Sequence, residues 1–274
     1  MLTSILVAAT ASCDCDRDAR RWITPPAAPP PRCIYVDLGL NDGGTLHAWY
    51  NNTGMGTLPR SSIGQSLKSL QRLRKEVYPL LTERGFKPGD CLAIGVEMLE
   101  AWSSTLRKQQ QALFAEGWAR ERPVLFLGRA VSTCDGLGLE HTLGTFGDGE
   151  VASAARVSQQ ILPVSKYAKA VAARMPNLTM DDSGRAHGRV VSLNVLRLLH
   201  ESVRRSDFVV VKMDIEATEY DVVPCLANSE QASLVDVLLL ERHPKMTTRK
   251  AVEALARATA ALRVKGTLVD EGWI

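Results

Sequence analysis

The chain has 274 residues, of which 45% are hydrophobic and 23% are charged, and its 33 basic and 30 acidic side chains leave a net charge of +3. This composition is that of a globular protein, and it excludes a collagen, a coiled-coil rod and a wholly disordered chain. So small a basic excess predicts no nucleic-acid partner, and without a run of about 20 apolar residues we expect no transmembrane segment.

The first 32 residues are expected to precede the folded domain. Residues 1–11, MLTSILVAATA, form an apolar run that ends like a signal-peptidase site, but no basic residue precedes the run. A short signal peptide and an ordinary cytoplasmic terminus both stay open. Residues 24–32, TPPAAPPPR, hold five prolines, which is typical of a linker. We therefore assign residues 1–32 to a leader and Pro-rich linker, and residues 33–274 to one domain.

The six cysteines are scattered along the chain. Cys13 and Cys15 form a C-x-C pair, but no second pair has the spacing of zinc ligands. Mostly free or buried thiols are the favoured interpretation, and a Cys13–Cys33 or Cys15–Cys33 disulfide is the alternative for a secreted protein. N-x-Thr sequons at Asn51 and Asn177 are compatible with secretion.

Apolar runs alternate with helical periodicity through the domain. Strands are expected at residues 33–37, 91–97, 123–127, 190–191, 207–214 and 234–241, with 267–273 as a further candidate. Helices are expected at residues 61–84, 100–116, 193–203, 217–226 and 248–264. The glycine-rich residues 136–188 show no clear pattern. Strands that alternate with helices and are apolar throughout predict an α/β fold, with a mostly parallel open sheet flanked by helices.

Acidic residues stand at the carboxyl ends of the expected strands. They are Asp37, Glu97, Asp214 with Glu216, and Glu241. Periodicity alone would scatter acids over exposed helix faces. Ligands of such sheets bind beyond the carboxyl ends of the strands, where the strand order reverses, so the clustering predicts a site.

The first strand runs into a glycine-rich turn. Gly39 would let the backbone come close to a ligand, and Gly43 or Gly44 would permit an unusual φ. The turn is not the G-x-G-x-x-G dinucleotide fingerprint, and a plain tight turn between a strand and a helix is an equal alternative. Glu97 could accept both ribose hydroxyls of an adenosine ligand. Its alternative is a solvated acid at a helix start.

The segment KMDIEATEY (212–220) is the most specific stretch of the sequence. Lys212, Asp214 and Glu216 would share one face as the strand ends, and burying such charges needs a partner or a purpose. One alternative is an ion pair between lysine and aspartate, with Glu216 and Glu219 capping the next helix. Metal binding through hard oxygen ligands is a third interpretation, but we assign no metal ligand from the sequence.

Glu241 and His243 follow the apolar strand at 234–241 and share a face by the same rule. Histidine is a natural general base near neutral pH. A hydrogen-bonded structural histidine is the alternative.

Three blocks, in this order, resemble the FkbM-type family of S-adenosylmethionine-dependent methyltransferases. YVDLGLNDGGT (35–45) looks like the family's D-x-G-x-N-x-G cofactor turn, VVVKMDIEATEYDVV (209–223) is similar to its K-x-D-x-E-G-x-E block, and VDVLLLERH (235–243) looks like its strand ending in E-x-H. The segments GVEMLEAW (95–102) and VSLNVLRLL (191–199) fit the connecting pattern. The resemblance covers the chain from about Cys33 to its end. Ala217 stands where the family usually has glycine.

The resemblance implies a Rossmann-like methyltransferase fold with S-adenosylmethionine as the cofactor. The turn would lie near the methionine end of the cofactor, and Glu97 would bind its ribose. The implied cofactor-binding residues are Asp37, Gly39, Asn41, Gly43 and Glu97. Asp214, Glu216 and Glu241 would border the methyl group and the acceptor, and together with His243 they are the expected catalytic residues. His243 or Asp214 could remove the proton of a hydroxyl acceptor.

The expected function is therefore O-methylation of a hydroxyl on a sugar, a glycan or a small metabolite. A secreted chain would suggest a glycan acceptor in the secretory-pathway lumen, and a cytoplasmic chain would suggest a metabolite. The alternative is a catalytically degenerate methyltransferase-fold module that only binds, which Ala217 favours. A nicotinamide-dependent oxidoreductase is a weaker third hypothesis, because the dinucleotide fingerprint is missing.

Overall fold

The structure is a computed structural model that describes residue 13 and residues 30–50, 71–145, 151–154, 178–180, 186–244 and 247–272. The signal-like segment, the asparagines of both sequons and the first part of the helix expected at 61–84 lie outside the described residues.

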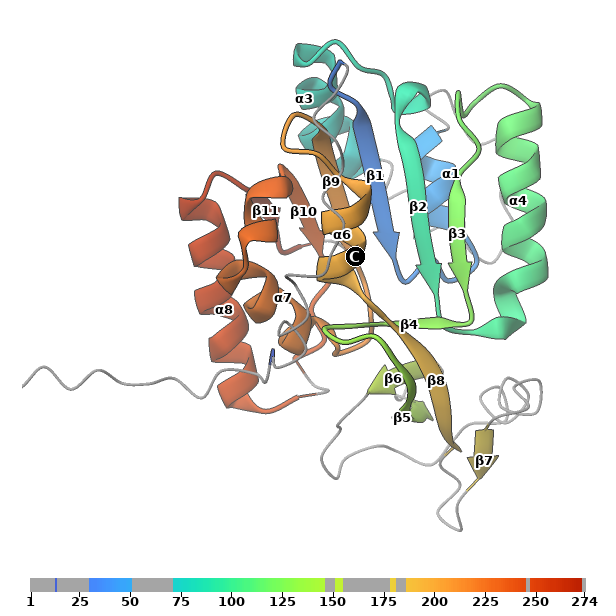
Figure 1. The fold of residues 1–274 in the computed structure, drawn as a ribbon, viewed down its shortest axis with the longest axis vertical. Helices are drawn as coiled ribbons and strands as arrows, with labels where there is room; N and C mark the ends of the chain where they lie inside the picture. The colour runs from blue at the N-terminus through green and yellow to red at the C-terminus, as the bar shows by residue number, and fades with distance from the viewer. Residues whose placement is uncertain are drawn as a thin grey trace, which may run out of the picture.

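Six parallel strands form the main sheet of the described residues, in the order β11-β10-β9-β1-β2-β3 (Figure 1). Their bounds are β1 (Cys33–Leu38), β2 (Leu92–Glu97), β3 (Val124–Leu127), β9 (Phe208–Met213), β10 (Val237–Leu240) and β11 (Leu268–Asp270). The strand order reverses between β1 and β9. In a Rossmann-like sheet, ligands bind beyond the carboxyl ends of the strands at this point, and we call this side of the sheet the expected ligand edge. The predicted α/β class with a mostly parallel sheet flanked by helices is confirmed.

Helices cover both faces of the main sheet. Because side chains alternate along a strand, β1 sends Ile34 and Val36 to one face and Cys33 and Tyr35 to the other. The first face packs against α6 (Val195–Ser202), α7 (Glu219–Asn228) and α8 (Arg249–Val264). The second face packs against α1 (Gly44–Tyr50), a π-helical turn (Leu73–Val77), α3 (Tyr78–Glu83) and α4 (Ser103–Ala115). Two buried faces explain why the strands are apolar throughout.

Helix ends follow local capping chemistry. The side chain of Asn194 accepts hydrogen bonds from two backbone N–H groups of the first turn of α6, so this helix begins two residues later than expected. Thr248 caps α8 in the same way. Gly85, at a φ of +79°, lies just after the end of α3, where glycine commonly ends a helix. Short 3₁₀ turns lie at Pro88–Asp90, Glu100–Trp102 and Glu230–Leu234. None of the helices in the described residues is long and apolar enough to cross a membrane.

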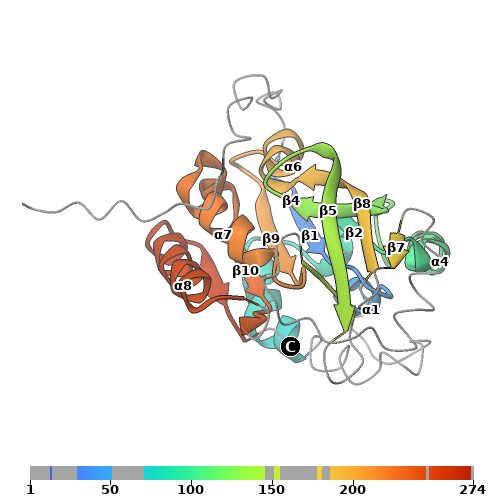
Figure 2. The ribbon, with the colours of Figure 1, turned by 90° about the horizontal axis from the view of Figure 1, so that it is seen from below.

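A second sheet, which the sequence did not predict, is inserted between β3 and α6. Its order is β4-β8-β5-β6, β7 pairs with β8, and only the β4–β8 pairing is parallel. Its strands are β4 (Arg129–Ser132), β5 (Gly136–Thr145), β6 (Val151–Ala154), β7 (Leu178–Met180) and β8 (Ala186–Asn194). Both views place it across the carboxyl-terminal edge of β1 and β2 (Figures 1 and 2).

The strand pattern of this second sheet was hidden by its composition. The β5 sequence, GLGLEHTLGT, contains three glycines, and glycine is depleted in strands. The two-residue strand expected at 190–191 is the middle of the longer β8, and it belongs to the second sheet.

The cysteines among the described residues are disulfide-bonded, so the prediction of mostly free or buried thiols is wrong about free thiols, although Cys33, Cys91 and Cys225 are buried. Cys33 pairs with Cys91, and Cys13 pairs with Cys225 of α7. Cys134 is disulfide-bonded as well. Neither disulfide considered from the sequence forms, because Cys33 starts β1 while Cys91 directly precedes its neighbour β2, and their Cα atoms are 4.4 Å apart.

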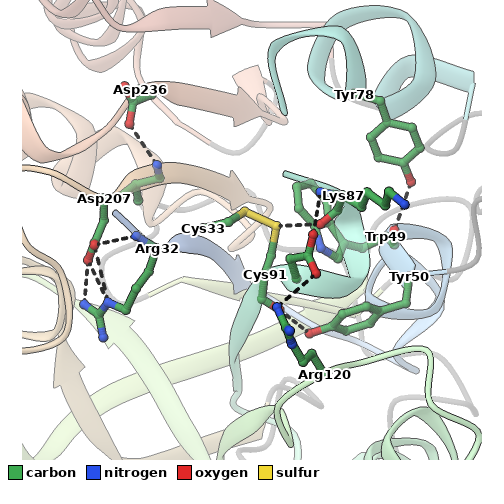
Figure 3. The surroundings of a disulfide bond; sticks show 12 residues. Arg32, Cys33, Trp49, Tyr50, Tyr78, Lys87, Cys91, Arg120, Asp207 and Asp236 are labelled. Atoms are coloured by element: carbon green, nitrogen blue, oxygen red, sulfur yellow. Dashed lines mark hydrogen bonds and ion pairs between the residues drawn. A yellow bond between two sulfur atoms is a disulfide. The ribbon is translucent and has the colours of Figure 1, made fainter. Parts of the chain in front are cut away.

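The amino-terminal edge of the main sheet is tied together beside this disulfide (Figure 3). Arg32, which precedes β1, donates from its backbone and its guanidinium to the carboxylate of Asp207, which precedes β9. The starts of three adjacent strands are therefore fixed at the edge opposite to the expected ligand edge.

Candidate functional site

A buried lysine joins the ends of β1 and β9. Asp37 and Lys212 are partners in the strand register, so their side chains lie side by side. The Nζ atom of Lys212 lies 3.3 Å from Oδ1 of Asp37 and 3.4 Å from Oδ2 of Asp214, and it donates to the carbonyl of Gly39 at 2.6 Å. Burial opposes the charge of Lys212, but Asp37 and Asp214 raise its pKa above the usual value. The ion-pair alternative is therefore confirmed for this lysine.

Asp37 holds the turn after β1 from inside the protein. It has no exposed surface, and its Oδ2 atom accepts from the hydroxyls of Thr45 at 2.6 Å and Tyr35 at 3.2 Å. Burial raises the pKa of Asp37, and the charge of Lys212 opposes that rise. Asp37 was predicted to bind the cofactor, but its side chain has no exposed surface and presents no oxygen to a ligand.

The glycines of the turn make room for the chain itself. Gly39 has a φ of +81°, and a Cβ atom there would lie 1.8 Å from the carbonyl oxygen of Asp214. This contact between strand ends, rather than the approach of a ligand, accounts for glycine at position 39. Gly43 has the unusual φ that was predicted, +85°, and Asn41 is also left-handed, at +52°.

Glu97 lies at the end of β2 and faces the same turn. The side chain is buried, its Oε2 atom accepts the backbone N–H of Asn41 at 2.7 Å, and its Oε1 atom accepts that of Leu99 at 2.6 Å. Burial raises the pKa of Glu97 to about 7. The alternative of a solvated acid is wrong. The structure instead joins two of the predicted cofactor-binding residues, Glu97 and Asn41.

The four predicted catalytic residues meet beyond the ends of β9 and β10. The Nε2 atom of His243 lies 3.4 Å from Oε2 of Glu216, 3.7 Å from Oε1 of Glu241 and 3.8 Å from Oδ1 of Asp214. On the other side of the ring, Nδ1 of His243 lies 3.0 Å from Oε1 of Glu219, which also accepts the backbone N–H of His243 at 3.1 Å. One imidazole is thus surrounded by four carboxylates.

This surrounding charge decides how His243 titrates. Burial lowers its pKa, but the hydrogen bond to Glu219 and the charges of Glu216, Glu219 and Asp214 together raise it to about 10. His243 therefore carries its proton at neutral pH and is not a free general base in this state. Burial and the charge of Asp214 raise the pKa of Glu241 to about 7.

Comparisons with known proteins match no family model, no curated protein and no solved structure. The identity of the site therefore depends on its geometry and on the motifs that it contains.

Glu219 is the site residue whose role was missed. From the sequence it was expected only to cap the next helix, whereas it is completely buried and holds the ring of His243. The available signal was its position, because a residue three places after Glu216 at the start of a helix points back toward the preceding strand.

Ala217 occupies a backbone conformation that favours glycine. Its φ is +76°, directly after Glu216 at +51°. Because an L-residue in this region costs about 1–2 kcal/mol, Ala217→Gly should stabilise the protein by about 1 kcal/mol and raise Tm by about 2–4 °C. Thermal unfolding of both proteins measures the shift. Ala260→Gly, on the exposed side of α8, is the control and should destabilise by about the same amount. A lower Tm for Ala217→Gly would contradict the prediction.

Proposed function

We propose that the protein is an S-adenosylmethionine-dependent methyltransferase whose acceptor is a hydroxyl on a sugar, a glycan or a small metabolite. The observation that carries this proposal is the buried carboxylate of Glu97 beside the left-handed turn at Asn41, where the strand order reverses. In open α/β sheets a nucleotide lies across this point, and an acid after the second strand binds its ribose. Each oxygen of Glu97 accepts one backbone hydrogen bond and keeps a second lone pair for a ribose hydroxyl.

The charges at the neighbouring strand ends suit the same cofactor. When bound, the cofactor supplies an electrophilic methyl group on a sulfonium cation. Asp214, Glu216 and Glu241 lie beyond β9 and β10 and would favour that positive charge. Methyl transfer is an in-line displacement in which positioning supplies much of the acceleration, so these residues would orient the acceptor hydroxyl toward the methyl group. The proton of the acceptor hydroxyl is expected to pass to Asp214, which is ion-paired with Lys212. His243 is a poorer candidate because it already carries a proton.

The disulfides favour a glycan among the proposed acceptors. Disulfides persist in oxidising compartments and are rare in the cytosol. Cys13 follows the signal-peptidase-like sequence at residues 9–11, so a processed chain would keep the Cys13–Cys225 bond. These features favour the secretory-pathway lumen, where glycans are abundant acceptors. The second sheet, which lies across the ligand edge, is the segment expected to contact such an acceptor (Figure 2).

The first experiment is calorimetric titration of the full chain with S-adenosylmethionine and with its demethylated product, with NAD as the control. Both adenosyl ligands should bind, and Glu97→Gln should weaken binding by about 10–100-fold, because hydrogen bonds to a charged group contribute about 1.5–3 kcal/mol. Glu83→Gln, on an exposed position of α3, is the matched control and should leave the affinity unchanged. Equal affinities for wild type and Glu97→Gln would reject Glu97 as the ribose ligand.

The same titration should depend on pH. With a pKa of about 7, Glu97 is protonated in acid, and one of its oxygens then donates a hydrogen bond where the carboxylate would accept one. Affinity should therefore fall as the pH is lowered, by about tenfold between pH 8 and pH 6, and Glu97→Gln should reduce this dependence to the part that comes from Glu241.

The outcomes also separate the alternatives. Binding of the adenosyl ligands without turnover on any acceptor would favour the degenerate module, and Ala217→Gly would be the variant in which to look for activity. A preference for NAD would favour the oxidoreductase. Failure of a folded protein to bind either adenosyl ligand would reject the methyltransferase proposal.

A further inference from the structure

We propose that Asp214, Glu216 and His243 form a binding site for a divalent metal cation, with Glu241 at its rim. The proposal goes beyond the methyltransferase assignment and does not depend on it. One ligand atom from each of the three residues lies within 4.8 Å of the other two. They come from two separate segments, the turn after β9 and the residues after β10, which the parallel pairing of these strands brings together.

The distances suit a cation at the centre of the group. Ligand atoms that lie about 2.0–2.2 Å from a divalent cation are about 3–3.5 Å from one another. The Nε2 atom of His243 is 3.4 Å from Glu216, 3.7 Å from Glu241 and 3.8 Å from Asp214. Side-chain movements of a few tenths of an ångström would complete the coordination, and the Nε2 proton of His243 would be released to solvent as the cation binds. The ligand side chains are 11–27% exposed, which leaves an open side for water or another oxygen ligand.

Glu219 gives an independent reason to expect a metal. It is completely buried, and its Oε1 atom holds Nδ1 of His243 at 3.0 Å. Metal-binding histidines almost always donate their second ring N–H to such a carboxylate, which fixes the tautomer and turns the other nitrogen toward the metal. The remaining oxygen of Glu219, Oε2, is buried and has no hydrogen-bond partner among the described residues. A buried carboxylate in this state is costly unless positive charge lies nearby.

The balance of charge points the same way. Lys212 and His243 together lie within ion-pair distance of five carboxylates. Two cationic side chains thus face five carboxylates, and a bound divalent cation would reduce this excess of negative charge. Two carboxylates with one imidazole favour Mn²⁺ among the common cations, since carboxylates suit Mg²⁺ and Mn²⁺ while imidazole suits the transition metals.

Titration with Mn²⁺ tests the site. The full chain is freed of metal with a chelator, the chelator is removed, and free Mn²⁺ is followed by electron paramagnetic resonance in the absence of S-adenosylmethionine. One equivalent should bind. Glu216→Gln, at a partly exposed ligand, and Glu219→Gln, at the positioning residue, should each weaken binding by at least about tenfold. Glu230→Gln, at an exposed acid outside the group, is the matched control and should bind like the wild type.

Two further measurements distinguish a loss of metal binding from a loss of folding in the variants. Nitrogen coupling to the bound Mn²⁺ should be present in the wild type and lost in His243→Ala, and Mn²⁺ should raise the Tm of the wild type but not that of Glu216→Gln. Displacement of Mn²⁺ by Zn²⁺ with the same loss in the variants would support the site and identify the preferred ion. No binding to the folded wild type, or equal affinity in Glu216→Gln and Glu219→Gln, would overturn the proposal. Because no adenosyl ligand is present, neither result bears on the methyltransferase proposal.

Discussion

Replacing Lys212 with methionine is expected to destabilise the protein by about 3–5 kcal/mol. Removing one partner of a buried ion pair leaves the other charge without compensation, and that residual charge accounts for most of the cost. The effect should be large here, because the lysine side chain is 2% exposed and the side chain of Asp37 is not exposed at all. The Gly39 carbonyl would lose its hydrogen-bond donor in the same variant. Urea unfolding, followed by far-UV circular dichroism, measures the change.

A double variant separates the charge effect from lost packing. Lys212→Met combined with Asp37→Asn removes both charges of the pair and should recover about 1–3 kcal/mol relative to the sum of the single variants. Lys250→Met, at an exposed position of α8, controls for the loss of a lysine and should change stability by no more than about 0.5 kcal/mol. If Lys212→Met changes the free energy of unfolding by as little as this control does, the structural role of the ion pair is contradicted.

Loss of the Cys13–Cys225 disulfide should be as costly. The bond joins residues separated by 212 positions, and constraining so long a loop in the unfolded chain corresponds to about 5 kcal/mol in the chain-entropy model. Cys13→Ala with Cys225→Ala should therefore lower the free energy of unfolding by about 3–5 kcal/mol. Thermal and urea unfolding of the oxidised proteins provide the comparison.

The second disulfide supplies the matched control. Cys33 and Cys91 are separated by only 58 positions, so the corresponding double alanine variant should lose about 1 kcal/mol less than the first. Wild-type protein in a reducing buffer should be less stable than either variant in an oxidising buffer. If reduction leaves the stability of the wild type unchanged, the bonds do not constrain the unfolded chain as proposed.

The main sheet could be predicted from the sequence because each of its strands has a local signal. Runs such as 208–211 and 237–240 are apolar on both faces, and each strand is followed by a helix with clear periodicity. The acids at the strand ends were found for the same reason, since a carboxylate after an apolar run is visible without knowledge of the fold. Strand register then brought Asp37 and Lys212 together, as the rule for parallel strands requires.

Features that depend on long-range contact could not be predicted in this way. No local pattern relates Cys13 to Cys225, because their pairing depends on where α7 packs. The burial of Glu219 depends on the approach of His243 from a different strand end. The reason for glycine at position 39 is likewise distant in sequence, since the space is taken by the carbonyl of Asp214.

The way in which the second sheet joins the main sheet has a consequence for how this protein can diversify. β4 starts two residues after β3 ends, β8 leads directly into α6, and these first and last strands of the insertion pair with each other from Arg129 and Val191 to Ser132 and Asn194. The inserted segment is therefore closed at its own base, and its length can change without altering the register of the six parallel strands. Selection can then exchange the part that lies over the carboxyl ends of the strands, while the strand ends beneath it stay the same.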